Sequence, residues 1–125
     1  MTPNNTDEKL TPHFSRGEFA CRCGCGFANA APALLFALEA VREHFDSPVQ
    51  ITCGCRCAKH NAETPGAAPD SRHTHGDAAD IKVKNVPPAE VADYCETLIG
   101  ARGGVGRYRT FTHIDTRGAA ARWNG

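Results

Sequence analysis

A short stretch of strict alternation near the middle of the chain constrains the fold most. In Ala78–Val83 ("AADIKV"), apolar residues at the odd positions alternate with Asp80 and Lys82. Because successive side chains of a strand point to opposite faces, the segment predicts a strand with one face in the core. Asp80 is then expected on the opposite face of the sheet.

Two amphipathic helices are predicted on either side of this strand. Residues 31–45 carry Leu, Val and Phe at helical spacing, with Pro32 in an early position, and residues 87–104 begin with prolines and have Gly100 as a cap. Shorter patterns predict strands at 48–53, 105–108 and 110–117, a loop at 58–72 and a short tail ending at Trp123. Together with the two helices, they predict an α+β domain with a small, mostly antiparallel sheet flanked by helices.

Length and charge limit the classes of protein that fit. The 125 residues suit one domain, and we expect a flexible N-terminal segment over 1–12 and a single, monomeric domain over 13–125. With 14 basic and 14 acidic residues the formal charge is zero, so we expect no nucleic-acid partner. No apolar run approaches ~18 residues, so no membrane-spanning segment is expected. The first residues lack a signal-peptide pattern, which predicts a cytoplasmic chain as synthesised.

The seven cysteines are unevenly spaced. Their odd number, without a signal peptide, argues against a secreted disulfide framework. Three interpretations remain: small buried apolar side chains with one or two bonded pairs, a second metal ion bound by thiolates, or redox chemistry. Six of the cysteines form two groups, Cys21, Cys23 and Cys25, and Cys53, Cys55 and Cys57, and Cys95 stands apart.

Three residues on neighbouring predicted elements are candidate metal ligands. His73 precedes Asp80 by seven positions, across a turn that contains Gly76. In 110–117 the strand period places His113 on the same face as Asp115. Two imidazoles and one carboxylate leave a fourth coordination position open, which is typical of a catalytic zinc ion. A surface histidine, or an aspartate paired with arginine, is the simpler interpretation of each residue taken alone.

Three segments, in the same order, resemble the zinc D-Ala-D-Ala carboxypeptidase family, whose relatives include phage endolysins and hedgehog-like domains. "SRHTHGDAAD" matches its S-x-H-x-x-G-x-A-x-D motif, "ITCGCRCAKHN" is similar to its S-G-Y-R-x-x-x-H-N segment, and "GGVGRYRTFTHIDTRG" is similar to its closing strand pair. The resemblance implies that family's hedgehog/DD-peptidase-like fold and one zinc ion held by His73, Asp80 and His113. It also implies that Arg56 binds the substrate carboxylate or the tetrahedral oxyanion.

The chain departs from this family at the expected general base. Many relatives carry an acid three residues before the last zinc histidine, where this chain has Thr110. Asp115 is the nearest acid on the predicted metal face, and we assign it the role of general base. An ion pair with Arg117 or Arg56 that orients the site is the alternative role for Asp115.

Substrate contacts are predicted for Arg56, Ser71 and His75. For Ser71, as for Asn61, a hydrogen bond that fixes the loop is the alternative. His75 is also the second candidate for proton transfer, and a solvent-facing role is its alternative.

The resemblance implies a zinc-dependent metallopeptidase, either a carboxypeptidase or an endopeptidase. Its substrates would be D-amino-acid-containing stem peptides of bacterial peptidoglycan, hydrolysed by a zinc-activated water, with action at the cell wall after release. The alternative is a non-catalytic zinc-binding module of the same fold, with a structural or assembly role.

Overall fold

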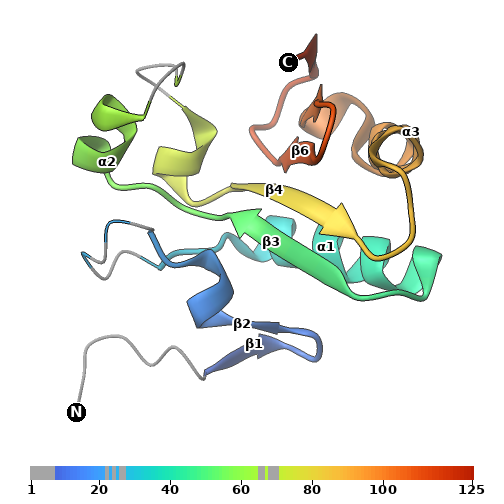
Figure 1. Cartoon of the computed structure of the whole chain (residues 1–125), viewed down its shortest axis with the longest axis horizontal. Helices are drawn as coiled ribbons and strands as arrows, with labels where there is room; N and C mark the ends of the chain where they lie inside the picture. Colours follow the sequence, from blue (N-terminus) through green and yellow to red (C-terminus); the bar gives the residue numbers. More distant parts are fainter. Residues whose placement is uncertain (1–7, 22, 24, 26–27, 65–66, 68–70) are drawn as a thin grey trace.

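A five-stranded sheet forms the centre of the molecule (Figure 1). The structure, a computed structural model, describes residues 8–21, 23, 25, 28–64, 67 and 71–125. The strand order is β3-β4-β6-β5-β7, and every neighbouring pair is antiparallel except β5 and β7, which are parallel. The strands are β3 (Val49–Cys53), β4 (Ala78–Val83), β5 (Gly104–Arg107), β6 (Thr112–Asp115) and β7 (Ala121–Asn124).

Two longer helices pack against this sheet and against each other. Helix α1 (Pro32–Phe45) begins at a proline and ends at Asp46, which has a left-handed backbone (φ 49°). Helix α3 (Pro88–Ile99) also begins at a proline and ends before Gly100 (φ 55°). Their buried side chains join the odd-numbered residues of β4 in one hydrophobic core. The predicted α+β class, both long helices and the mostly antiparallel sheet are therefore confirmed.

Three parts of the structure differ from the sequence-based expectation. The predicted loop at 58–72 contains a short helix, α2 (Ala58–Glu63), and ends in a 3-10 turn, η2 (Arg72–His75). The predicted tail forms β7. Within the N-terminal segment expected to be flexible, Lys9–Thr11 forms β1, which pairs with β2 (Phe14–Ser15), while residues 1–7 lie outside the described part.

The remaining 3-10 turns are η1 (Arg16–Phe19) and η3 (Gly100–Arg102). In Figure 1 the segment around η1 runs beside β3 and leads to the region below α2. This segment buries Phe14 and Phe19 in the main core. The carbonyl of Phe19 accepts from the N–H of Cys55 at 2.9 Å, so η1 lies next to the end of β3, which pairs with the start of β4.

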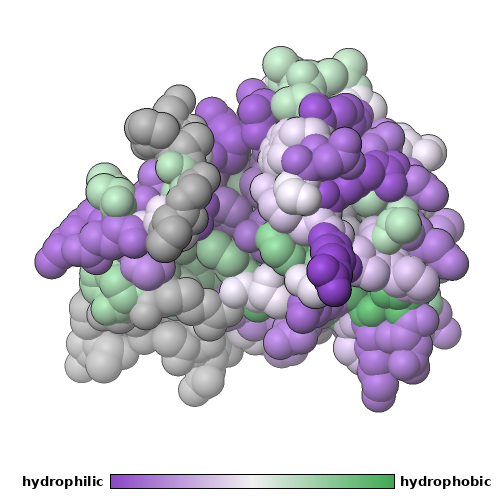
Figure 2. All heavy atoms as spheres, turned by 45° about the horizontal axis from the view of Figure 1, so that its top comes forward, coloured by the Kyte–Doolittle hydropathy of each residue, from purple (hydrophilic) through white to green (hydrophobic). Residues whose placement is uncertain are grey.

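The face of the molecule seen in Figure 2 is mainly polar in its described part. Hydrophilic residues cover most of the described part of this face, and hydrophobic residues form small, separate groups (Figure 2). Among the described residues, no helix is both long enough and apolar enough to cross a bilayer.

Candidate metal centre

The three predicted ligands come together where η2 leads into β4 and where β4 pairs with β6. Asp80 on β4 lies directly opposite His113 on β6 in the antiparallel register. His73 comes from η2, and Gly76 reverses the chain after it with a positive φ of 73°. The sheet register and this turn therefore bring all three side chains to one place.

One carboxylate oxygen is shared between the two imidazoles. Oδ1 of Asp80 lies 3.3 Å from Nε2 of His73 and 3.0 Å from Nδ1 of His113. Zinc–ligand bonds of about 2.0–2.1 Å in a tetrahedral arrangement place donor atoms about 3.3 Å apart. These two contacts therefore have the spacing that a bound zinc ion requires.

The outer nitrogen of each imidazole is occupied by a partner of its own. Nδ1 of His73 lies 2.5 Å from the carbonyl oxygen of Gly54, and Nε2 of His113 lies 2.8 Å from Oδ2 of Asp115. Both partners can only accept, so that nitrogen donates to them, and the other nitrogen of each ring would be the one to bind a metal ion. Metal-bound histidines are oriented in this way in known metal sites. Two imidazoles and one carboxylate are donors of the kind that zinc binds.

A thiol lies at the edge of the same site. Sγ of Cys53 is 3.8 Å from Nδ1 of His73, and donor atoms of Cys53, His73 and Asp80 all lie within 4.8 Å of one another. The thiol approaches the His73 nitrogen that already contacts Gly54, whereas Nδ1 of His113 lies 3.0 Å from Oδ1 of Asp80. We therefore favour His113 over Cys53 as the third ligand.

The ionisation of Asp80 and His73 reflects their proximity. Burial by itself raises the pKa of Asp80, but hydrogen bonds from His113 and His73 outweigh it and hold this pKa at about 2. Burial lowers the pKa of His73, but the contacts with Asp80 and Cys53 outweigh it and raise this pKa to about 10. Asp80 is therefore a carboxylate over the whole physiological range, as a metal ligand must be.

Asp115 is fully buried, and both of its carboxylate oxygens are engaged. Besides His113, it accepts hydrogen bonds from the backbone N–H of Gly104 at 2.9 Å and from two nitrogens of the Arg117 guanidinium at 2.9 and 2.7 Å. Burial raises its pKa, but His113 and Arg117 outweigh it and hold the pKa below its usual range. A general base works best with a pKa near the operating pH. The geometry thus favours the orienting role of Asp115, and the general-base role stays a prediction without geometric support.

The other predicted site residues lie after β3, at η2 and in α2. Arg56 follows β3, its backbone N–H donates to the carbonyl of His73 at 2.9 Å, and its side chain donates to Ser71 Oγ at 2.9 Å. Its buried Nε has no hydrogen-bond partner among the described residues. Ser71 also accepts from the backbone N–H of His73 at 3.3 Å, which matches its alternative, loop-fixing role. His75 is exposed on η2, and Asn61 is buried in α2.

Sequence reasoning missed Trp123 as part of the site. Its ring centroid lies 4.9 Å from that of His113, and the Arg117 guanidinium lies 5.3 Å from the centre of the Trp123 ring. The close pairing of β7 with β5 makes this contact possible, because a Cβ atom on Gly106 would come within 2.6 Å of the indole. The signal in the sequence was Gly106 in "VGR". Its need for a missing side chain becomes clear only when its pairing partner on β7, Trp123, is known.

The chain is similar to known peptidases across this site. Residues 12–115, which include all three candidate ligands, match the family model described as peptidase M15. The chain is 36% identical over 86 residues to the probable peptidoglycan L,D-endopeptidase MepK of Haemophilus influenzae. That match covers 64% of this chain and 45% of the relative, so the chain spans about half of the relative's length. No solved structure gives a significant match.

Proposed function

Because this chain belongs to the peptidase M15 family, we propose that it is a zinc-dependent peptidase that hydrolyses stem peptides of bacterial peptidoglycan. The observation that carries the proposal is the position of Asp80 Oδ1, which lies 3.3 Å from Nε2 of His73 and 3.0 Å from Nδ1 of His113. A structural zinc site closes its fourth position with another protein ligand, whereas three ligands leave room for water and substrate.

Each residue of the centre has a task in this proposal. A zinc ion bound by His73, Asp80 and His113 would polarise the scissile carbonyl and lower the pKa of a water to around 7. Asp115 fixes the ring of His113, and Gly54 fixes the ring of His73. The exposed His75 on η2 is then the first candidate for moving the proton to the leaving amine.

Arg56 is proposed to bind negative charge on the substrate. Its side chain is held by Ser71, one hydrogen bond away from the backbone of His73. The side chain of Arg56 is half-buried, and its planar guanidinium suits a carboxylate or the oxyanion of the transition state.

The substrate class is proposed from the relative's name, which specifies a peptidoglycan L,D-endopeptidase. Both an internal bond and a C-terminal bond of a stem peptide fit the open coordination position. The test is incubation of the zinc-loaded chain with purified muropeptide monomers and cross-linked dimers, followed by mass spectrometry of the products. Cleaved dimers indicate an endopeptidase, and loss of a terminal residue from monomers indicates a carboxypeptidase. His113→Ala is the matched inactive control.

A non-catalytic zinc-binding module remains the second candidate, because Thr110 stands where many relatives carry an acid and Asp115 is engaged elsewhere. The same experiment separates the two. Fully zinc-loaded chain that leaves monomers and dimers intact would favour the non-catalytic module.

A further inference from the structure

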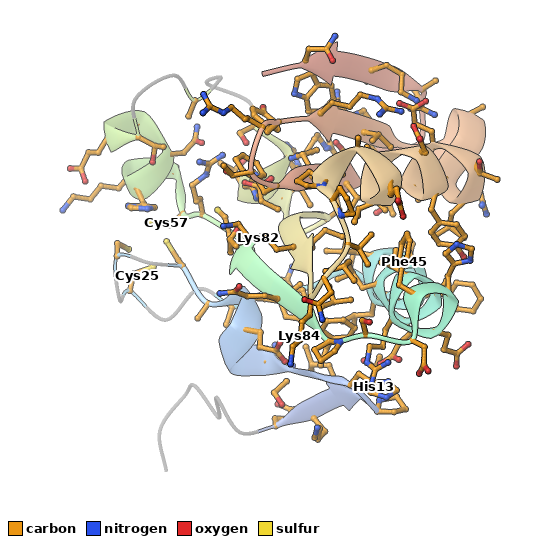
Figure 3. All side chains as sticks on the ribbon, turned by 45° about the vertical axis from the view of Figure 1, so that its right-hand side comes forward. His13, Cys25, Phe45, Cys57, Lys82 and Lys84 are labelled. Carbon is orange, nitrogen blue, oxygen red and sulfur yellow. The ribbon has the colours of Figure 1, made fainter. Side chains whose placement is uncertain are left out.

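Four cysteines outside the candidate metal centre gather their sulfur atoms around one point. Cys21, Cys23 and Cys25 lie between η1 and α1, and Cys57 is the residue before α2. Their Sγ atoms all lie within 4.8 Å of one another. In Figure 3 the labelled Cys25 and Cys57 lie on the same side of the molecule, where the N-terminal segment passes beside α2.

The sulfur–sulfur distances fit a common metal ion better than disulfides. Sγ of Cys21 lies 3.4 Å from Sγ of Cys23 and 3.9 Å from Sγ of Cys57, and the Cys23–Cys57 distance is 3.6 Å. A disulfide requires about 2.05 Å, and all four residues are free cysteines. Zn–S bonds of about 2.3 Å in a tetrahedral arrangement place sulfur atoms about 3.8 Å apart. The observed distances lie around that value.

Backbone N–H groups already point at two of these sulfurs. The N–H of Cys57 donates to Sγ of Cys21 at 3.4 Å, and the N–H of His60 donates to Sγ of Cys57 at 3.4 Å. A zinc ion with four thiolates carries net negative charge, and such N–H groups stabilise it. The sulfur of Cys55 takes no part, because it donates to the carbonyl of Phe19 at 2.9 Å and accepts from Asn29 N–H at 3.3 Å.

We propose that Cys21, Cys23, Cys25 and Cys57 form a second, structural zinc site. Four sulfur ligands close the coordination sphere, so this site has no position for substrate. Each thiol releases its proton to solvent as its sulfur binds the ion. The site ties the N-terminal segment to the start of α2, one residue after Arg56, and its chemistry does not depend on the proposed peptidase activity.

The test is the zinc content of the full chain purified under reducing conditions. The wild type should bind about two zinc ions and the double variant Cys23→Ser/Cys25→Ser about one. Both replaced residues are exposed, so loss of the core is not expected. Cys95→Ala, which changes the cysteine outside the cluster, should keep both ions. In His113→Ala, X-ray absorption should show a sulfur shell at about 2.3 Å around the remaining zinc.

Unchanged zinc content in the double variant, or a shell of nitrogen and oxygen alone in His113→Ala, would overturn the proposal. Disulfides among these four cysteines in the zinc-treated protein, detected by intact mass, would overturn it as well. If the double variant fails to fold, cobalt titration of the wild type replaces it. Intense thiolate-to-cobalt charge-transfer absorption then supports the site, and its absence argues against it.

Discussion

Asp115 accepts a hydrogen bond from Nε2 of His113 at 2.8 Å and so turns Nδ1 of that ring toward Asp80. We expect Asp115→Asn to weaken zinc binding at the site by roughly 10–100-fold, as for other partners that orient a metal-bound histidine. The reason is that one oxygen of an amide cannot accept from both His113 and Arg117 as two carboxylate oxygens do. Competition with a chromophoric chelator measures the affinity.

Asp93→Asn is the matched control for that measurement. Asp93 also pairs with an arginine, Arg107, at 2.6 Å, but it is 71% exposed and lies on α3. Its replacement should leave zinc affinity unchanged. An Asp115→Asn variant with full zinc affinity but a rate reduced by roughly 10²–10⁴-fold would instead support the general-base role.

Arg56→Lys should reduce kcat/KM on a muropeptide by about tenfold or more, because lysine keeps the charge but loses the planar fork. Zinc content should stay unchanged, since Arg56 donates to the candidate ligand His73 through its backbone and its side chain donates to Ser71. The checks are steady-state kinetics and a melting curve. Arg102→Lys, at an exposed arginine, is the control. A large fall in melting temperature without a kinetic effect would identify Arg56 as a structural residue.

Trp123 should report on zinc binding by its fluorescence. It is the single tryptophan of the chain, and its ring lies 4.9 Å from that of His113. Fixing the His113 ring by a metal changes the surroundings of the indole, so we expect a saturable change in emission on zinc titration. The change should disappear in His113→Ala. The same titration curve in both proteins would show that the signal comes from elsewhere.

Gly54→Ala should destabilise the fold by about 1–3 kcal/mol, the usual cost of overpacking. A Cβ atom at this position would lie 2.5 Å from the Cα of Phe19, which is backbone and cannot rotate away. The shift should also disturb the carbonyl that contacts His73. Denaturant unfolding with and without zinc measures both effects. A variant as stable as the wild type would mean that the Phe19 segment moves freely.

The positions of Asp80 and His113 could be predicted from sequence because they depend on strand periodicity, whereas His73 lies in the turn η2. The alternation in β4 places Asp80 opposite the core, and the same period in β6 places His113 and Asp115 on one face. Periodicity does not show what lies beyond that face. The contact of Asp115 with Gly104 follows from the pairing of β5 with β6, and Arg117 lies two residues after Asp115. Only the structure shows that both contacts are made, and so distinguishes an orienting carboxylate from a free one.

The missed elements are short and lack a hydrophobic pattern. Helix α2 ("AKHNAE") buries a single residue, the polar Asn61, so no apolar stripe signals a helix. Strand β7 ("ARWN") has four residues, and it is held by parallel pairing with β5, a contact between distant parts of the chain. Local sequence patterns contain little information about either.

The close approach of Phe19 to Gly54 has a consequence for exchanging this domain between proteins. The carbonyl of Phe19 accepts from the N–H of Cys55 at 2.9 Å, and the neighbouring Gly54 holds His73. The segment around Phe19 therefore supports the backbone that contacts His73 in the candidate metal centre. A chimaera that joins a foreign sequence directly to α1 would lose this support, so a domain moved into another protein has to begin before η1.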